Sequence, residues 1–237
     1  MSDRYNYAEH TRSREQSQDA ATSFLNGVYL WMTLGLALTG ATALYVANTE
    51  WLVEAIFSNN IAFIGLILAE LGLVLFLSAR IHTLSPGTAS GLFLLYALLN
   101  GLTLSLIFLI YTRQSIATAF FVTSATFGAM SIVGFVTRTD LTKLGSLAMM
   151  AIIGGIIASI VNWFLASEAL YWIITYVLLA AFIGLVAYDT QQIKRLAAGG
   201  FADKGQESRA TILGALLLYI DFINILLLML RIFGRRR

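Results

Sequence analysis

The stretch "LLLYIDFINILLLMLR", residues 216–231, places one carboxylate in the middle of a segment that is otherwise apolar. A charged side chain at the centre of a bilayer costs roughly 2.5–3.5 kcal/mol on insertion scales, so such residues normally face the interior of a helix bundle. Leu218, Asn224 and Ile225 share a helical face with Asp221, so the polar groups form one stripe. The stretch therefore predicts a membrane-spanning helix enclosed by other helices.

Six further apolar segments precede this one, each about 20 residues or slightly longer, which is enough to cross a hydrocarbon core of roughly 30 Å. Spanning β-strands would need shorter segments with strict alternation, which these segments lack. The sequence therefore predicts an all-α, polytopic membrane protein. The expected spans are Gly27–Ala47, Asn60–Ala79, Ala89–Tyr111, Ser115–Val136, Leu144–Leu165, Ala169–Tyr188 and Ala210–Leu230.

Composition agrees with this fold class, because 58% of the 237 residues are hydrophobic and 12% are charged. A soluble domain carries about a quarter charged residues. The chain has no cysteine, which excludes disulfides, thiolate metal sites and cysteine nucleophiles. The basic residues flank the apolar segments as topology signals, so nucleic acid is not an expected partner. We expect no tightly bound cofactor.

The domain organisation is a polar N-terminal arm, residues 1–23, followed by one transmembrane domain, residues 24–237. The arm lacks the features of a cleaved signal peptide. A cytoplasmic N-terminus collects most lysines and arginines on the cytoplasmic side, as topology rules favour. If the last segment crosses fully, the basic terminal stretch "RIFGRRR" lies on the non-cytoplasmic side, against the topology rule. A re-entrant last segment would return these arginines to the cytoplasmic side. A full span is the preferred prediction.

Few polar residues interrupt the spans. Glu70 is the only other acidic residue within them, while Arg80 and Asp189 lie at span ends. Three asparagines, Asn100, Asn162 and Asn224, are candidates to line a polar interior. Each of these residues has a structural alternative: interfacial anchoring for Arg80 and Asp189, a protonated packing carboxyl for Glu70, and packing hydrogen bonds for the asparagines.

No familiar enzyme signature is present, and we expect a protein that is not an enzyme. The zinc-protease, serine-hydrolase and P-loop spacings are absent. An intramembrane aspartyl protease would also place two aspartates on neighbouring helices. "AYDTQ" supplies its Tyr-Asp element at Asp189, but "LYIDFIN" lacks the glycines expected beside the second aspartate.

The same two stretches carry a family resemblance. "AYDTQQIK", residues 187–194, followed by "GALLLYIDFINILLLMLRIFG", residues 214–234, resembles the C-terminal signature of the Bax inhibitor family. "VYLWMTLGLALTGATALYVAN", residues 28–48, and "LSARI", residues 77–81, are similar to the bacterial inner-membrane branch. The resemblance covers nearly the whole chain beyond residue 22.

The resemblance implies a seven-helix bundle in the bacterial inner membrane with the last helix at its centre. It implies a pH-sensitive calcium leak channel in which Asp189 and Asp221 form the gating pair and the possible Ca²⁺ ligands. It also matches Arg80 to a basic latch, although its spacing from Glu70 differs by about one residue from the family pattern. Other branches of the family are regulators of a membrane protease, or suppress cell death in eukaryotes.

Elementary electrostatics is compatible with such a gate. Two carboxylates within about 4–6 Å in a poorly hydrated site do not both ionise cheaply, and they exchange protons in coupled steps. Asp189 and Asp221 reach the same depth only if the sixth span continues as a helix through "TQQIKR". The alternative function is a non-conducting scaffold, in which the N-terminal arm and residues 189–209 bind a membrane protease or another partner.

Overall fold

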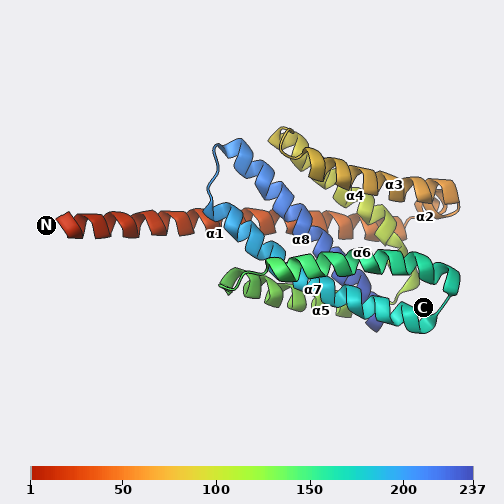
Figure 1. Cartoon of the computed structure of the whole chain (residues 1–237). Coiled ribbons are helices and arrows are strands. Elements are labelled where there is room, and N and C mark those ends of the chain that lie inside the picture. The colour runs from red at the N-terminus through yellow and green to blue at the C-terminus, as the bar shows by residue number, and fades with distance from the viewer. Residues whose placement is uncertain (1, 237) are drawn as a thin grey trace.

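The computed structural model describes the backbone of residues 2–236 and the side chains of residues 22–236. Within that range the chain forms eight helices joined by short loops (Figure 1). They are α1 (Ser2–Ala47), α2 (Glu50–Phe57), α3 (Asn60–Arg80), α4 (Pro86–Ile110), α5 (Arg113–Val136), α6 (Thr142–Leu165), α7 (Glu168–Ala198) and α8 (Lys204–Phe233).

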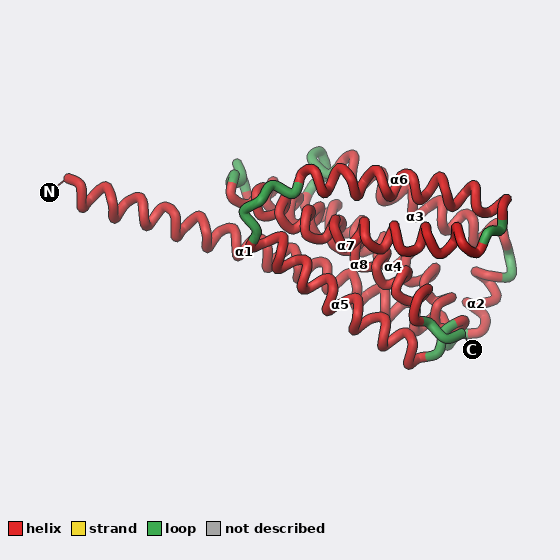
Figure 2. Tube along the Cα trace, turned by 60° about the horizontal axis from the view of Figure 1, so that its bottom comes forward, coloured by secondary structure: helices red, strands yellow, loops and turns green. Residues whose placement is uncertain are grey.

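Seven of these helices are long and apolar enough to cross a membrane, which confirms the predicted fold class. The first candidate span is Thr22–Ala47, the apolar part of α1. The short helix α2 was not predicted, because its eight residues are too few to give a clear helical pattern. Figure 2 shows it as a separate turn of helix between α1 and α3.

Side-chain caps explain where most of the helices begin. Ser85 accepts a hydrogen bond from Thr88 N, with Pro86 at the first helical position, so α4 begins three residues before the predicted span at Ala89. Asn59, Thr112, Ser167 and Asp203 cap α3, α5, α7 and α8 in the same way. These residues provide acceptors for backbone N–H groups that would otherwise lack partners at the helix ends.

Helix α8 lies at the centre of the bundle. In its most apolar segment 67% of the residues are buried, against 6% to 33% in the other spans. It contacts α1, α4, α5 and α7, whereas α6 packs mainly on α7 and α3 mainly on α4. Tyr219 is fully buried and its hydroxyl lies 2.7 Å from Thr39 Oγ1. Thr39 in turn donates to the Ala97 carbonyl, which ties α8 to α1 and α4.

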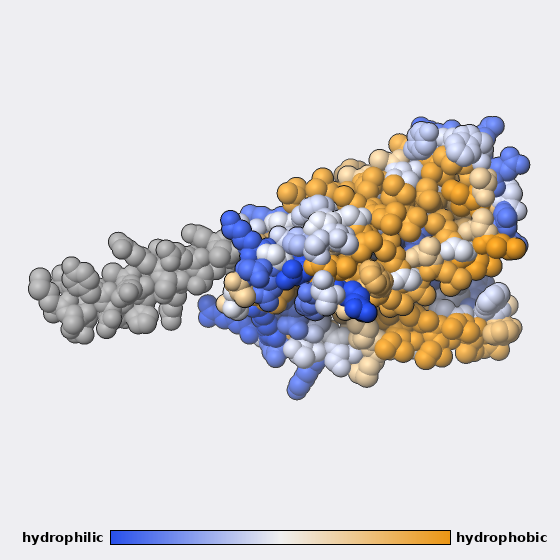
Figure 3. All heavy atoms as spheres, turned by 90° about the horizontal axis from the view of Figure 1, so that it is seen from above, coloured by the Kyte–Doolittle hydropathy of each residue, from blue (hydrophilic) through white to orange (hydrophobic). Residues whose placement is uncertain are grey.

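The outer surface is apolar where the spans cross. Figure 3 shows a wide orange zone over the helices, with hydrophilic residues gathered towards the two ends. Exposed apolar side chains are concentrated on the peripheral helices, including Ile61, Leu68 and Leu75 on α3 and Ile153, Ile160 and Trp163 on α6. Lipid solvates these side chains, so their exposure indicates no protein partner.

The sequence-based boundaries were wrong at one important place. The apolar pattern predicts that the sixth span ends at Tyr188 and the seventh begins at Ala210. Helix α7 instead runs to Ala198 and α8 begins at Lys204, which leaves residues 199–203 as the loop. The extension is polar but still helical, because its side chains find partners on a neighbouring loop, as described below.

The two ends of the bundle are distinct. The N-side holds the loops at residues 81–85, 137–141 and 199–203, and the C-side holds the loops at 48–59, 111–112 and 166–167 (Figure 1). The chain terminus also lies on the C-side: Thr112 N donates to the Arg235 carbonyl at 3.1 Å, and Arg235 N donates to Ser115 Oγ at 3.0 Å. Since α8 is one unbroken helix from the N-side to the C-side, the geometry favours a full span over re-entry.

A reporter fused after Arg237 is therefore expected on the opposite side of the membrane from a reporter fused at Met1. With the orientation that the basic residues favour, the Met1 reporter is cytoplasmic and the Arg237 reporter is periplasmic. Paired alkaline phosphatase and green fluorescent protein fusions measure both positions. A cytoplasmic reading from both fusions would contradict the seven-span topology.

The closest helix contact lies between α5 and α7. A Cβ atom built on Gly134 would lie 2.2 Å from the Ala187 carbonyl oxygen, so only glycine permits this approach. Small residues at helix interfaces let the backbones approach closely in membranes. The contact lies two residues before Asp189 and therefore fixes the position of α7 near that residue.

Gly134→Ala is expected to destabilise the protein by about 1–3 kcal/mol, because the added methyl forces α5 and α7 apart. Gly154→Ala on α6 is the matched control, since a Cβ there meets no atom within 4 Å. Thermal unfolding in detergent measures both variants. Equal melting temperatures for the two variants would mean that the α5–α7 contact is not tight.

Candidate functional site

The structure brings Asp189 of α7 and Asp221 of α8 together inside the bundle. Their carboxyl groups lie close enough to interact directly. Asp221 is 3% exposed, and its Oδ2 has no hydrogen-bond partner among the described residues. Asp189 is partly buried. A buried polar atom without a partner is rare in folded proteins and often marks a functional position.

The meeting of the two aspartates depends on local sequence. "TQQIKR" continues α7 as a helix beyond Asp189, as the predicted pairing required. Helix α8 begins near Lys204, well before its apolar core, so Asp221 falls about mid-helix. Thr190, adjacent to Asp189, is also fully buried, and its hydroxyl has no hydrogen-bond partner in the described part of the chain. Thr190 is three residues after Ala187 and so shares the face of α7 that packs on α5.

No cation neutralises the pair directly. Between residues 22 and 236 the salt bridge present joins Arg195 to Asp140, and it involves neither member of the pair. Arg80, the predicted latch, is the last residue of α3, and its side chain is exposed. Its backbone carbonyl accepts hydrogen bonds from Thr83, which close the turn after α3. The structure thus places Arg80 at the N-side surface and shows no ion pair between Arg80 and the aspartates.

Glu70 occupies a different position from the pair. It lies on α3 and accepts a hydrogen bond from the Thr103 hydroxyl of α4. Because α3 packs mainly on α4, this bond joins a peripheral helix to the bundle. This hydrogen bond is the kind of contact that a packing carboxyl would make between helices. The ion-lining role of Glu70 stays a prediction.

The three asparagines differ in their surroundings. Asn100 is buried on α4 and donates to the Tyr96 carbonyl at 3.2 Å. Asn224 donates to the Ile220 carbonyl at 2.8 Å, so this amide N–H bonds its own helix. Asn162 accepts a hydrogen bond from Ser167 N at 3.1 Å in the turn between α6 and α7. The structure therefore places Asn162 near the C-side end of α6, where it bonds the turn in which Ala166 adopts a left-handed conformation, and away from the predicted interior stripe.

A small cavity beyond Asp221, towards the C-side, has a mostly apolar lining. Beyond Asp221, the residues Phe222, Ile223 and Leu226 of α8 line a small cavity of about 110 Å³ together with Phe108 of α4 and Phe120 of α5. The rings of Phe120 and Phe222 are in edge contact, with their centroids 5.7 Å apart.

The acidic pair lies apart from any larger cluster of metal-ligating side chains in the described part of the chain. Across residues 22–236 there is no group of three or more His, Cys, Asp or Glu residues that could hold a metal ion. Calcium takes six to eight oxygen ligands in a typical protein site. Asp189 and Asp221 together supply fewer oxygens than such a site uses.

The polar extension of α7 holds the loop between α5 and α6. Gln191 accepts a hydrogen bond from Leu141 N at 2.9 Å and donates to the Thr139 carbonyl at 2.8 Å. Lys194 Nζ donates to the Phe135 carbonyl at 2.6 Å and lies 4.8 Å from the Phe135 ring centroid. These bonds start half a turn beyond Asp189, so the end of α7 is fixed to α5 and α6.

Asp140 completes the attachment of this loop. Hydrogen bonds from the Thr142 hydroxyl and the Thr142 backbone N–H, followed by one from Arg195, lower the pKa of Asp140 to about 2. The carboxylate thus remains ionised at every physiological pH. The loop attachment is therefore insensitive to pH in the range in which a gate would work.

Sequence reasoning missed this attachment. Lys194 and Arg195 were interpreted only as topology signals, and Gln191 was not singled out. Their spacing of three and four residues from Gln191 places all three on one helical face, which was the available signal. The identity of the loop that they bind was not readable, since it depends on how α5, α6 and α7 pack together.

Comparisons with known proteins identify the family of this chain. Residues 21–237 match the model of the family described as inhibitor of apoptosis-promoting Bax1, so the match includes both aspartates and all seven spans. The chain belongs to the Bax inhibitor family. The predicted resemblance is thus confirmed.

Individual bacterial relatives cover nearly the full chain. The chain is 48% identical to the inner membrane protein YbhL of Escherichia coli K12 over 94% of its length and 95% of the relative. It is 41% identical to an uncharacterized protein of Borreliella burgdorferi, over 90% of this chain and 92% of that protein. It is also 40% identical to an uncharacterized protein of Deinococcus radiodurans, over 94% of this chain and 95% of that protein. Together with the seven apolar helices, these similarities identify a multi-pass inner-membrane protein.

Gln191→Ala is expected to release the loop at residues 137–141, because it removes both hydrogen bonds to the Leu141 and Thr139 backbones. A net hydrogen bond contributes about 0.5–1.5 kcal/mol, so amide exchange at Leu141 should accelerate up to about tenfold. Hydrogen–deuterium exchange mass spectrometry measures the exchange rate of this amide. Gln192→Ala is the matched control, since Gln192 bonds Tyr188 and Arg195 of its own helix. Unchanged exchange in Gln191→Ala would exclude the attachment.

Proposed function

We propose that the protein is a pH-sensitive cation leak channel of the inner membrane, with calcium as the permeant ion, gated by Asp189 and Asp221. The single observation that supports this proposal is the buried pair itself. Two interacting carboxyl groups lie between α7 and α8, without a salt-bridged cation among residues 22–236 and with one oxygen unpartnered. If the contact between α7 and α8 were purely structural, apolar side chains would make it at a lower free-energy cost in the membrane.

Proton sharing is the first step of the proposed mechanism. Two ionised carboxylates in contact and out of water repel each other and lose hydration, so the closed arrangement holds at least one proton between them. The shared proton allows a hydrogen bond that draws α7 and α8 together. Loss of this proton leaves two like charges in contact, which separates the helices.

Separation of the helices is the second step. It exposes carboxylate oxygens, which are hard ligands suited to Ca²⁺. It also disturbs the apolar contacts around Phe222 that close the C-side half of the interior. Hydrophobic constrictions of this kind close pores by excluding water, and widening them restores conduction.

The orientation in the membrane follows from charge in this proposal. The N-side carries Arg80, Arg138, Lys143, Lys194, Arg195, Lys204 and Arg209, and it becomes the cytoplasmic side under the positive-inside rule. The C-side carries Arg113, Arg231, Arg235 and Arg236, so the bias is clear but incomplete. Asp189 and its polar helix extension then lie towards the cytoplasm. The channel responds to cytoplasmic pH in this arrangement.

Purified protein in calcium-loaded liposomes tests the proposal. Wild-type flux should rise with pH as the shared proton is lost. Asp221→Asn and Asp189→Asn should each flatten the pH dependence, because either change removes the coupled titration while keeping the side-chain shape. The double variant should differ from either single variant by less than about twofold, since one coupled pair is involved.

The controls separate the pair from its surroundings. Glu70→Gln removes the other intramembrane carboxylate and should leave the pH profile unchanged. Arg80→Ala should raise basal leak if Arg80 latches the pair in solution, and have no effect if it is an interfacial anchor. Persistent flux with an unchanged profile in Asp221→Asn would exclude the pair as the gate. Absence of calcium flux through the wild-type protein at every pH would favour the alternative function, a non-conducting scaffold that binds a membrane protease.

A further inference from the structure

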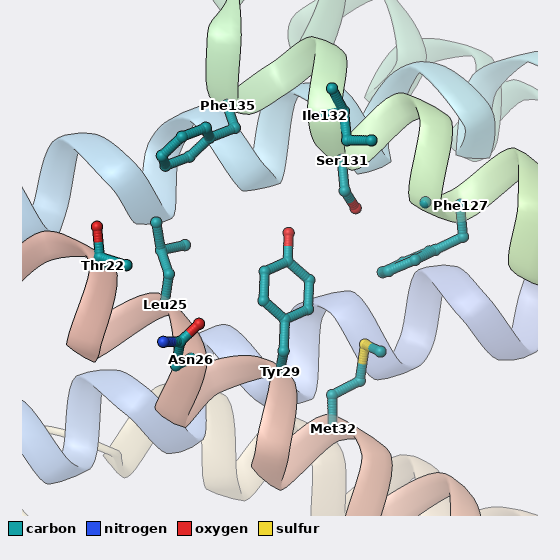
Figure 4. Close-up of a pocket in the computed structure, with 10 residues that line it drawn as sticks. Thr22, Leu25, Asn26, Tyr29, Met32, Phe127, Ser131, Ile132 and Phe135 are labelled. Carbon is teal, nitrogen blue, oxygen red and sulfur yellow. The ribbon is translucent and has the colours of Figure 1, made fainter.

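A lateral groove lies between α1 and α5, outside the carboxylate site (Figure 4). Its volume is about 490 Å³, within the range typical of small-molecule sites. Most of its wall is apolar. It is lined by Thr22, Leu25, Asn26, Tyr29 and Met32 of α1 and by Phe127, Gly128, Ser131, Ile132 and Phe135 of α5.

The groove exists because α1 and α5 pack on common neighbours and make few contacts with each other. Helix α1 packs on α4 and α8, and α5 packs on α7 and α8. Gly128 deepens the groove, since a Cβ built there meets no atom within 4 Å. Ile132 and Phe135 on its wall are exposed, so the groove opens sideways within the spans. Its occupant therefore comes from the bilayer.

Four polar side chains interrupt the apolar wall, those of Thr22, Asn26 and Tyr29 on α1 and that of Ser131 on α5. Ser131 is 7% exposed, and its Oγ has no hydrogen-bond partner among the described residues. Figure 4 shows the Tyr29 hydroxyl reaching across the groove towards Ser131. Ser131 lies five residues before the end of α5 at Val136, about 7 Å at 1.5 Å per residue. This depth is near the boundary of the hydrocarbon core, where the ester groups of phospholipids lie.

The N-side rim of the groove is positively charged. Lys194 Nζ lies 4.8 Å from the ring centroid of Phe135, which lines the groove. Arg138 follows Phe135 by three residues, is exposed and forms no salt bridge within residues 22–236. The nearest carboxylate in sequence, Asp140, is already paired with Arg195. The rim therefore favours an anionic group.

We infer that this groove is a binding site for an anionic phospholipid of the N-side leaflet. One acyl chain lies along Leu25, Met32 and Phe127. An ester oxygen accepts hydrogen bonds from the hydroxyls of Tyr29 and Ser131, which are otherwise costly to bury without a partner. The phosphate and its anionic headgroup lie beside Arg138 and Lys194, as polybasic segments at a membrane surface favour.

Native mass spectrometry of the full-length protein in detergent tests the site. The probes are phosphatidylglycerol and phosphatidylcholine with identical acyl chains. Wild type should bind phosphatidylglycerol more tightly than phosphatidylcholine. Gly128→Leu fills the groove and should weaken phosphatidylglycerol binding at least about fivefold, as expected when a ligand loses its apolar pocket. Gly72→Leu on α3 is the matched control, since it adds the same side chain where a Cβ also meets no atom within 4 Å.

Arg138→Gln tests the headgroup contact separately and changes only an exposed side chain. It should reduce phosphatidylglycerol affinity by about fivefold and leave phosphatidylcholine unchanged, because one cation near a membrane surface contributes at this level. Equal binding of the two lipids by the wild type would overturn the proposal, as would equal effects of Gly128→Leu and Gly72→Leu. A free fatty acid would be the occupant instead if oleate displaced phosphatidylglycerol from the wild type and the Arg138→Gln variant bound oleate as tightly as the wild type does.

The lipid assay measures no ion flux, so its failure is distinguishable from failure of the channel proposal. Thermal unfolding of each variant in lipid-free detergent shows whether it is folded. A Gly128→Leu protein that melts like wild type and still binds phosphatidylglycerol normally would exclude the groove as the site.

Discussion

The structure depends on the burial of one carboxylate, that of Asp221, in a helix that must cross lipid. A bilayer offers no water to an ionisable group, so the rest of the protein has to enclose it. This requirement explains why α8 is central while α3 and α6 are peripheral. It also explains why Asp221 and Asn224 share one face of α8. Tyr219, two residues before Asp221, points to another side of α8 and bonds Thr39 of α1.

Much of the fold was predictable from the sequence because lipid imposes a strong pattern. The length of the apolar segments is enough to predict the seven spans, and the capping preference of a serine followed by proline is enough to predict the start of α4 at Ser85–Pro86. The pairing of Asp189 with Asp221 was predictable from the family resemblance. The end of α7 was not, because hydropathy falls at Asp189 while the helix continues to Ala198. The residues that stabilise this extension have their partners on a loop some 50 residues earlier in the chain.

The site was predicted less completely than the fold, and the reason is tertiary packing. Asn162 and Asn100 look alike in sequence, since each is a lone amide in an apolar segment. Asn100 is buried on α4, whereas Asn162 bonds the turn after α6. Arg80 likewise follows an apolar span at the family's basic position, yet its side chain is exposed. Only the packing of neighbouring helices distinguishes these cases.

The attachments of α7 and α8 limit how the aspartate pair can separate. The N-side end of α7 is held by Gln191 and Lys194 to the loop and helix before α6, and Gly134 fixes α5 against α7. These contacts make the N-side halves of α5 and α7 one unit.

The C-side end of α8 is held elsewhere. Arg231 donates to Thr175 Oγ1 at 3.2 Å and lies over the Tyr171 ring, and the terminal residues bond Thr112 and Ser115. A helix fixed at its C-side end moves most at its N-side end. Repulsion between Asp189 and Asp221 would therefore swing the N-side half of α8 and the loop at residues 199–203 away from α7, while the C-side contacts act as the hinge. The proposed lipid groove has one wall on the N-side half of α5, within the unit that this movement leaves in place, and the other wall on α1, which packs on α8. A movement of α8 would therefore reach the groove through α1, so the proposed lipid site and the proposed gate share a neighbouring helix.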